Sequence, residues 1–143
     1  MIAIACDHGG YELKLQIIKY LEAKGFDYID YGCNGESVDY PIYAKKVGQA
    51  IQSGECEQGI LICGTGIGMS IAANKVDGIR AAHITDCYSA RMAREHNDAQ
   101  IVCLGERITG CDLALEMVDA YLKAEHLGDR HARRVEKIMN LEK

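Results

Sequence analysis

GILICGTGIGMSIAAN, residues 59–74, joins an apolar run to a glycine-rich turn and the start of a helical pattern. The run Ile60–Cys63 has no polar alternation, which is typical of a strand covered by helices on both faces of a parallel sheet. Cys63 ends this run, directly before the turn. A thiol at this place lies near the unpaired N–H groups of a helix N-terminus, which stabilise a thiolate or a bound anion. The stretch therefore predicts a central parallel strand and a proton-transfer site.

Strand and helix patterns alternate on both sides of this stretch. Further strands are expected at Ile2–Cys6, Phe26–Tyr31, Ile79–Ile84 and Ile101–Leu104. Amphipathic helices lie between them, one of them begun by the single proline, Pro41. Repeated strand–helix units predict an α/β fold, a three-layer αβα sandwich around a five-stranded, parallel, Rossmann-like sheet. We expect one domain over residues 1–143 because no linker or repeat interrupts the pattern.

The C-terminal segment predicts a short helix over about 130–141. Val135, Ile138 and Met139 share its apolar face. Arg130 and Arg134 are four residues apart, so they point together in another direction. Because this helix is short and comes after all the expected strands, we expect it at an interface with a partner subunit.

Composition restricts the class of protein. The chain has 143 residues, is 48% hydrophobic and carries a formal net charge of -5, which fits one soluble domain and argues against non-specific nucleic-acid binding. It shows neither a secretory signal nor a run of membrane-spanning length, so we expect no membrane association and a cytoplasmic location. The seven cysteines are odd in number and form no C-x-x-C pair, which fits neither a disulfide framework nor a structural zinc site.

The glycine-rich turn after Cys63 has two interpretations. Gly64, Gly66 and Gly68 serve a tight strand-to-helix turn, or they also expose N–H donors to an oxyanion. A dinucleotide fingerprint needs glycine where Met69 stands, and a cysteine phosphatase loop needs arginine there. Neither NAD binding nor phosphoryl transfer is therefore expected. A thiolate beside N–H donors suits the removal of a proton from carbon, with the donors holding enediolate oxygens.

Two histidines adjoin loops that carry other polar residues. His8 follows Asp7 after the first strand, and His96 precedes Asn97 before the fifth strand. Ligands of open α/β sheets gather at the carboxyl ends of the strands. We therefore expect both loops to converge with the Cys63 turn at one edge of the sheet.

The remaining histidines and arginines are less specific signals. His83 and His126 stand alone, so we interpret them as surface residues or as residues with satisfied hydrogen bonds. Arg130 and Arg134 form either a solvated helix face or a phosphate clamp, with Arg107 as a third cation. The acidic composition of the chain favours the clamp. Cys6 and Cys103, which lie in apolar strands, are interpreted as packing residues.

Together these motifs resemble the type B ribose-5-phosphate isomerases and the related galactose- and allose-6-phosphate isomerases. The resemblance covers nearly the whole chain and rests on Asp7-His8, CGTGIGMSIAANK from Cys63, HND from His96, LGER ending at Arg107 and GDRHARRVEKI from Gly128. It implies an aldose–ketose isomerase of the pentose phosphate pathway that needs no metal or cofactor. D-Ribose 5-phosphate and D-ribulose 5-phosphate would interconvert through a cis-enediolate. An allose- or galactose-6-phosphate isomerase and a non-catalytic sugar-phosphate-binding subunit are the alternatives.

The resemblance also implies roles for individual residues. Cys63 would be the catalytic base, His96 would assist ring opening and Thr65 would belong to the anion hole. Substrate would also contact Asp7, His8, Gly64, Gly66, Ile67, Gly68, Asn97, Arg107, Arg130 and Arg134, the three arginines holding its phosphate. One branch of the family uses a glutamate at the position of Met69, so the cysteine places this chain in the thiol branch. The family forms homodimers or tetramers whose active sites take residues from two subunits.

Overall fold

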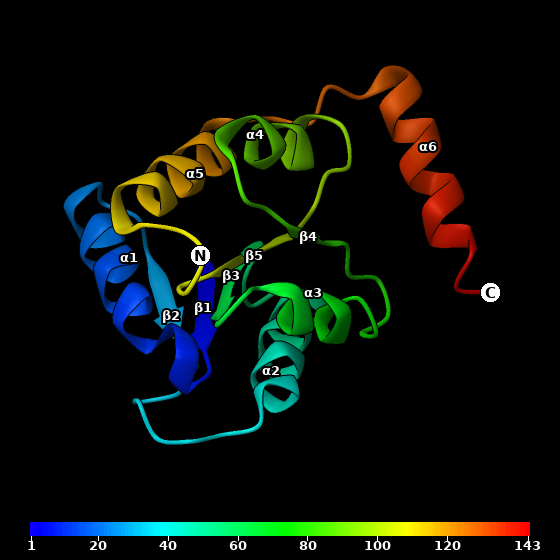
Figure 1. Ribbon diagram of the computed structural model, residues 1–143. Helices are drawn as coiled ribbons and strands as arrows, with labels where there is room; N and C mark the ends of the chain where they lie inside the picture. Colours follow the sequence, from blue (N-terminus) through cyan, green and yellow to red (C-terminus); the bar gives the residue numbers. More distant parts are fainter.

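The apolar run before the glycine turn forms β3 (Gln58–Cys63), the middle strand of a five-stranded parallel sheet. The computed structural model describes residues 1–143, and its strand order is β2-β1-β3-β5-β4 (Figure 1). The other strands are β1 (Ile2–Cys6), β2 (Tyr28–Asp30), β4 (Ala81–His83) and β5 (Ile101–Gly105). β3 pairs with β1 on one side and with β5 on the other. The predicted central position of this strand is confirmed.

Helices cover both faces of the sheet, which confirms the three-layer architecture (Figure 1). One face is covered by α1 (Tyr11–Ala23), α4 (Cys87–Glu95) and α5 (Cys111–Lys123). The other face is covered by α2 (Tyr40–Gln52), which has its proline in the first turn, and by α3 (Ile67–Ala73). A single 3-10 turn, η1 (His8–Gly10), joins β1 to α1. None of the helices has the length and apolar character needed to cross a bilayer.

Successive residues of β3 enter two separate hydrophobic cores. Ile60 and Ile62 belong to the core beneath α1, α4 and α5, whereas Leu61 and Cys63 belong to the core beneath α2 and α3. This alternation follows from the two-residue period of a strand. Burying each Ile or Leu side chain fully contributes about 1.5–3 kcal/mol to the stability of the fold. Apolar residues on both faces of the strand are therefore favoured. The sequence therefore shows no polar alternation here.

The two edge strands are shorter than the sequence predicts. β2 covers three of the six residues expected at 26–31, and β4 covers three of the six expected at 79–84. Each edge strand pairs with one neighbour over only three residues. Ile79 and Ile84 are buried beyond the ends of β4, and Ile84 keeps one backbone hydrogen bond to β5, from its N–H to Cys103 O at 3.0 Å. Their apolar character therefore follows mainly from burial.

The last helix, α6 (Asp129–Asn140), lies outside the three layers and projects from the body of the molecule (Figure 1). His131 is its only buried residue, and Ile138 on its apolar face is 42% exposed. The helix occupies the range that the sequence predicts. Its packing against a partner subunit stays a prediction.

Candidate active site

The turn after β3 directs a backbone donor at the sulfur of Cys63. Gly66 N–H donates to Cys63 Sγ at 3.0 Å, and the cysteine is 5% exposed. Gly66 has a φ of 84°, in the left-handed region that residues with a Cβ rarely adopt. A donor in this position stabilises negative charge on the sulfur. The thiol is thus held at the carboxyl edge of the sheet with its sulfur facing a backbone donor.

Further N–H groups of the same turn have no acceptor within the chain. They belong to Gly64, Thr65 and Gly68, at and just before the N-terminus of α3. The N–H of Ile67 donates to Thr65 Oγ1 at 3.2 Å. Unpaired donors at a helix N-terminus attract oxyanions. The arrangement can therefore hold negative oxygen atoms close to the thiol.

Asp7, His8 and Arg107 lie at this same edge. The Asp7 carboxylate accepts from Gly9 N–H at 2.8 Å, and a Cβ added to Gly9 would lie 3.2 Å from Gly64 N. Arg107 N–H donates to Gly64 O at 3.0 Å, and its guanidinium covers Gly64. The exposed ring of His8 accepts a long bond, 3.4 Å, from Val38 N–H. We call Asp7, His8, Cys63, residues 64–68 and Arg107 the carboxyl-edge half-site.

His96 and Asn97 do not join this group. They follow α4 and precede β5, so they lie at the amino edge of the sheet, where the parallel strands begin. The five residues of β5 span about 16 Å between the two edges. The expectation that all the polar loops converge at one edge is therefore wrong for this loop. A loop that precedes a strand opens on the opposite edge from a loop that follows one.

A histidine outside the predicted set packs against His96. The rings of His96 and His131 are stacked, with centroids 4.1 Å apart and planes 9° from parallel. His131 is buried, and its Nε2 atom has no hydrogen-bond partner. Burial, followed by the nearby His96, Arg130 and Arg134, lowers the pKa of His131 below its ordinary value. The one signal in the sequence was its place directly after Arg130 in the cationic segment.

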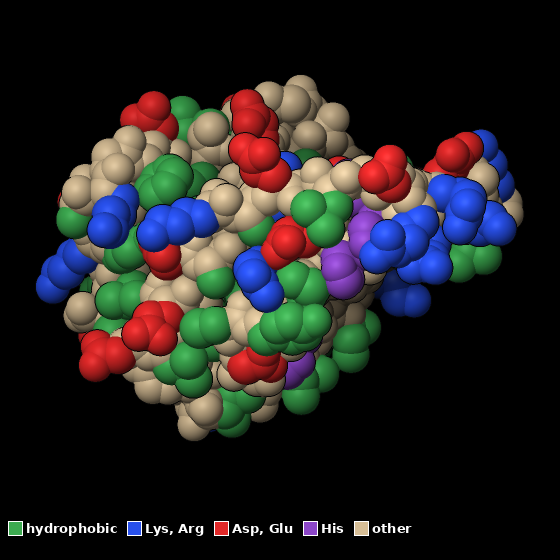
Figure 2. Space-filling view, turned by 90° about the horizontal axis from the view of Figure 1, so that it is seen from above, with side chains coloured by type: hydrophobic (Ala, Val, Ile, Leu, Met, Phe, Trp, Pro, Cys, Tyr) green, Lys and Arg blue, Asp and Glu red, His purple; other side chains and the backbone are tan.

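Arg130 and Arg134 extend this second group along α6. Both are exposed, and neither they nor Arg107 form an ion pair with a carboxylate of the same chain. Histidine side chains gather beside Lys and Arg side chains where α6 meets the body (Figure 2). We call His96, Asn97, Arg130, His131 and Arg134 the amino-edge half-site. The predicted arginine trio is therefore divided, because Arg107 belongs to the other edge.

His83 is a second residue whose position the sequence did not indicate. It ends β4, and its Nε2 atom lies 2.8 Å from the carbonyl oxygen of Thr65. A Cβ added to Gly66 would lie 2.8 Å from the His83 ring. His83 thus packs against the glycine turn. His126 donates from Nδ1 to Glu95 O at 3.0 Å, so its hydrogen bond is satisfied, as expected from the sequence. The available signal was that His83 ends an expected strand.

The other strand thiols lie in apolar surroundings. Cys6 and Cys103 are completely buried. Burial is the main cause that raises the pKa of Cys6 to about 12, and it raises that of Cys103 well above the ordinary range of a thiol. A thiol of this kind is unreactive at neutral pH because the thiolate is the nucleophile and base. The interpretation of both residues as packing residues is confirmed.

The main hollows of the single chain are not lined by half-site residues, although Glu95 and Glu106, next to His96 and Arg107, line two of them. The largest, about 670 Å³, is lined by residues such as Asp30 and Lys46 beside β2, and none of the five most pronounced hollows includes a half-site residue. No group of three or more His, Cys, Asp or Glu side chains is arranged to hold a metal ion. Neither half-site is thus enclosed in a main hollow of the single chain.

Known proteins resemble this chain over almost its full length. A family model described as Ribose/Galactose Isomerase matches residues 2–138. The chain is 48% identical to ribose-5-phosphate isomerase B of Escherichia coli, covering 99% of this chain and 95% of that relative. It is also 48% identical to D-erythrulose-4-phosphate isomerase of Pectobacterium atrosepticum, covering 96% of this chain and 91% of that relative. The ribose-5-phosphate isomerase B structure of Clostridium thermocellum matches with a TM-score of 0.97 at 59% identity, covering 99% and 96% of the two chains.

Proposed function

The chain belongs to the ribose/galactose isomerase family, and we propose that it interconverts D-ribose 5-phosphate and D-ribulose 5-phosphate. Its similarity to ribose-5-phosphate isomerase B of E. coli, which covers 99% of the chain, supports this reaction. One contact carries the proposed mechanism, the 3.0 Å hydrogen bond from Gly66 N–H to Cys63 Sγ. It joins a thiol and an anion-binding turn at the end of the central strand.

In this mechanism the Cys63 thiolate removes the proton from C2 of the open-chain aldose. The electron pair of the broken C–H bond forms the C1–C2 double bond of a cis-enediolate, and the free N–H groups of the turn stabilise its oxygens. The proton then returns to C1, while a second proton moves from O2 to O1. No atom is gained or lost overall. Thr65 lines the turn, and Asp7 and His8 bind the sugar from the same edge.

A complete site then needs a second copy of the chain. His96 would assist opening of the furanose ring, Asn97 would bind sugar oxygens, and Arg130 and Arg134 would bind phosphate together with the partner's Arg107. Because the amino-edge half-site lies across the sheet from Cys63, these residues can meet that thiol only in another subunit. Exposed apolar residues support such an interface, with Ile67 and Ile71 at 50% and 59% on α3 and Ile138 at 42% on α6. A twofold dimer would form two sites, each with one half-site from each chain.

A panel of phosphorylated aldoses tests the reaction. Ribose 5-phosphate should be the preferred substrate over allose 6-phosphate and galactose 6-phosphate. Cys63→Ala should lower kcat about 10²- to 10⁴-fold, which is the usual contribution of a general acid or base. Cys111→Ala is the matched control because that thiol is exposed at the start of α5, outside both half-sites. Near-normal turnover by folded Cys63→Ala would refute the base assignment, and tight binding of sugar phosphates without turnover would favour a non-catalytic binding subunit.

A further inference from the structure

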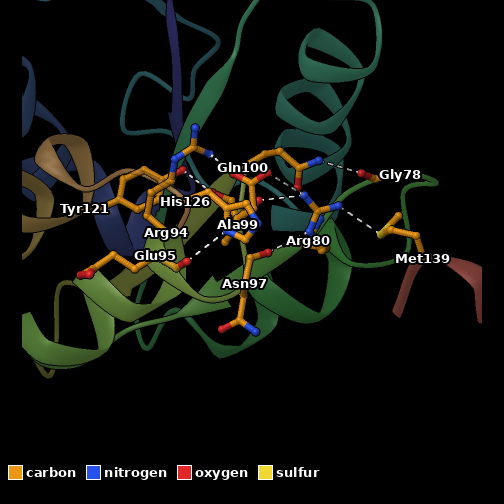
Figure 3. Close-up of polar contacts among 11 residues, drawn as sticks. Gly78, Arg80, Arg94, Glu95, Asn97, Ala99, Gln100, Tyr121, His126 and Met139 are labelled. Atoms are coloured by element: carbon orange, nitrogen blue, oxygen red, sulfur yellow. Dashed lines mark hydrogen bonds and ion pairs between the residues drawn. The ribbon is translucent and has the colours of Figure 1, made fainter. Parts of the chain in front are cut away.

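Arg80 lies directly before β4, with its backbone fixed to the start of β5. Its N–H donates to Gln100 Oε1 at 2.8 Å, and its carbonyl oxygen accepts from Gln100 N–H at 3.1 Å. Gln100 is fixed in turn, since its side-chain amide donates to Gly78 O at 2.8 Å (Figure 3). The arginine side chain is only 16% exposed. The Arg80 side chain is therefore oriented by its contacts with the protein.

The guanidinium of Arg80 binds the loop of the amino-edge half-site. Nε donates to Asn97 O at 3.0 Å, and Nη2 donates to Asp98 O at 2.8 Å. Nη1 reaches Met139 Sδ, on α6, at 3.1 Å (Figure 3). One planar group thus connects β4, the loop after His96 and the helix that carries Arg130 and Arg134.

This loop has an unusual backbone, which the Arg80 contacts hold together with the hydrogen bond from Asp98 N–H to Arg94 O at 3.2 Å. Asp98 has a φ of 46°, in the left-handed region that residues with a Cβ seldom adopt. Its carboxylate receives Arg94 Nη1 at 2.7 Å and lies 3.8 Å from Arg80 Nη2. Conformations of this kind persist where the surroundings determine them fully, and they concentrate at functional sites.

Arg80 binds the two carbonyls and leaves the side chains of His96 and Asn97 unbound by it. The Asn97 amide points away from Arg80 (Figure 3). The His96 ring is stacked on His131 of α6. Both side chains follow the backbone that Arg80 holds, so a shift of this backbone would displace them together.

We propose that Arg80 is a positioning residue for ring opening, because it holds the 97–98 carbonyls and α6 in the register that His96 and Asn97 require. The inference rests on the proposed function, in which His96 assists opening of the furanose ring. Arg80 itself does not touch the substrate. Lysine cannot replace it, because a compact ammonium lacks the rigid fork that spans two successive carbonyls.

The two pentose phosphates separate positioning from a general structural role. Ribose 5-phosphate is a furanose that must open before C2 can lose its proton. Ribulose 5-phosphate cannot form a furanose, since the hydroxyl at C5 that would close the ring is esterified. Exchange of its C1 proton with deuterated water therefore requires Cys63 and the glycine turn, but not ring opening.

The experiment compares Arg80→Lys with Arg91→Lys, whose exposed arginine pairs with the partly buried Glu95 on α4. For Arg80→Lys, kcat with ribose 5-phosphate should fall about 10- to 100-fold, the scale of loss when a reacting group is displaced by about 1 Å. At saturating ribulose 5-phosphate, exchange at C1 should fall far less, because displacement of Asn97 and of the α6 arginines weakens substrate binding and not proton transfer at Cys63. Arg91→Lys should change neither rate.

Equal loss of both activities in folded Arg80→Lys, or loss of neither, would overturn the inference. Asp98→Asn provides a second variant if Arg80→Lys does not fold, because asparagine accepts the left-handed backbone and only the carboxylate is lost. It should show the same selective loss at smaller size, and an equal loss of both rates would again overturn the inference. If the unmodified protein neither isomerises nor exchanges, the proposed function fails first and this inference fails with it.

Discussion

At the carboxyl edge of the sheet a backbone N–H faces the candidate catalytic sulfur, whereas at the amino edge side chains supply the contacts to the His96 ring and to the 97–98 carbonyls. Cys63 faces a backbone N–H, and Gly105 of β5 lies so close to Thr65 that a Cβ there would overlap its backbone. At the other edge the contacts are an imidazole stack and the bonds of the Arg80 guanidinium to two carbonyls. Only the carboxyl-edge half-site is attached directly to the three inner strands.

This difference indicates which half is complete within one chain. Donors at the end of a central strand take their places as soon as the sheet and α3 form. The cations of α6 have much less support, because His131 is the only buried residue of that helix. We therefore expect a second chain to complete the site and to fix α6 at the same time. Mutations at the two edges test whether each active site combines one half-site from each of two chains.

Exchange of half-sites between chains should give the largest effect. Cys63→Ala and His96→Asn should each be nearly inactive alone. In a hybrid dimer both defects fall in one site, and the other site is intact. Random exchange makes half of the dimers hybrid, so the mixture should regain about one quarter of the unmodified activity. Ribose 5-phosphate turnover of the mixture, compared with that of each variant alone, measures the recovery.

The control mixture combines two defects of the same half-site. Cys63→Ala and Thr65→Ala both alter the carboxyl edge, so every site of a hybrid contains one of them. This mixture should stay no more active than Thr65→Ala alone. Recovery in both mixtures, or in neither after verified subunit exchange, would refute a site shared between the two edges.

Removal of one phosphate-binding arginine from either edge should give an effect of intermediate size. Arg107→Ala and Arg134→Ala should each lower kcat/KM for ribose 5-phosphate about 10- to 150-fold, because a hydrogen bond to a charged group contributes about 1.5–3 kcal/mol. Inhibition by inorganic phosphate should weaken in parallel, and turnover of unphosphorylated ribose should not change. Arg133→Ala is the control, since its side chain points about 100° away from Arg134 around the helix.

Similar losses from the two edges would place the phosphate between them. A loss confined to Arg107 or to Arg134 would place the phosphate in one half-site alone. If either variant impaired unphosphorylated ribose as much as ribose 5-phosphate, that arginine would have no specific role toward phosphate.

The fold could be predicted where local pattern and tertiary contacts agree. Ile60–Cys63 is apolar on both faces, and the strand proved to be central. Pro41 lies in the first turn of α2, as its fixed φ favours. The edge strands could not be bounded, since their ends depend on pairing with a neighbour. Lys14 shows the same limit, because its complete burial depends on Asp30 at 2.8 Å and Cys33 O at 2.6 Å, which are distant in sequence.

The site could be predicted as a set of residues but not as an arrangement. Motifs indicated Cys63, the glycine turn and the arginines, since their chemistry is carried by residue type and spacing. The division of the site follows from strand direction, because His96 precedes a strand and Cys63 ends one. The stack of His131 on His96 could not be predicted, since it depends on where a helix beyond the sheet returns to the body.

The smallest effect expected is a pH-dependent weakening of the amino edge. Burial and the neighbouring His96, Arg130, Arg134 and His126 lower the pKa of His131 in the folded chain. As the pH falls below the unfolded value of about 6.5, the unfolded chain binds a proton that the folded chain still rejects. The free energy of unfolding should therefore decrease as the pH falls from about 6.5 to the lowered pKa of His131. Above about pH 7.5 the ring is neutral in both states, so stability should not depend on His131.

His131→Gln removes this proton, so its urea midpoint should fall less between about pH 7.5 and about pH 5.5 than that of the unmodified protein. Both proteins must be compared at one protein concentration, because association with a second chain adds to apparent stability. His8→Gln is the control at the carboxyl edge, and it should keep the steeper fall. If His131→Gln and the unmodified protein lost stability equally, the cations around α6 would not oppose protonation of this ring, and the amino edge would be no more sensitive to acid than the thiol edge.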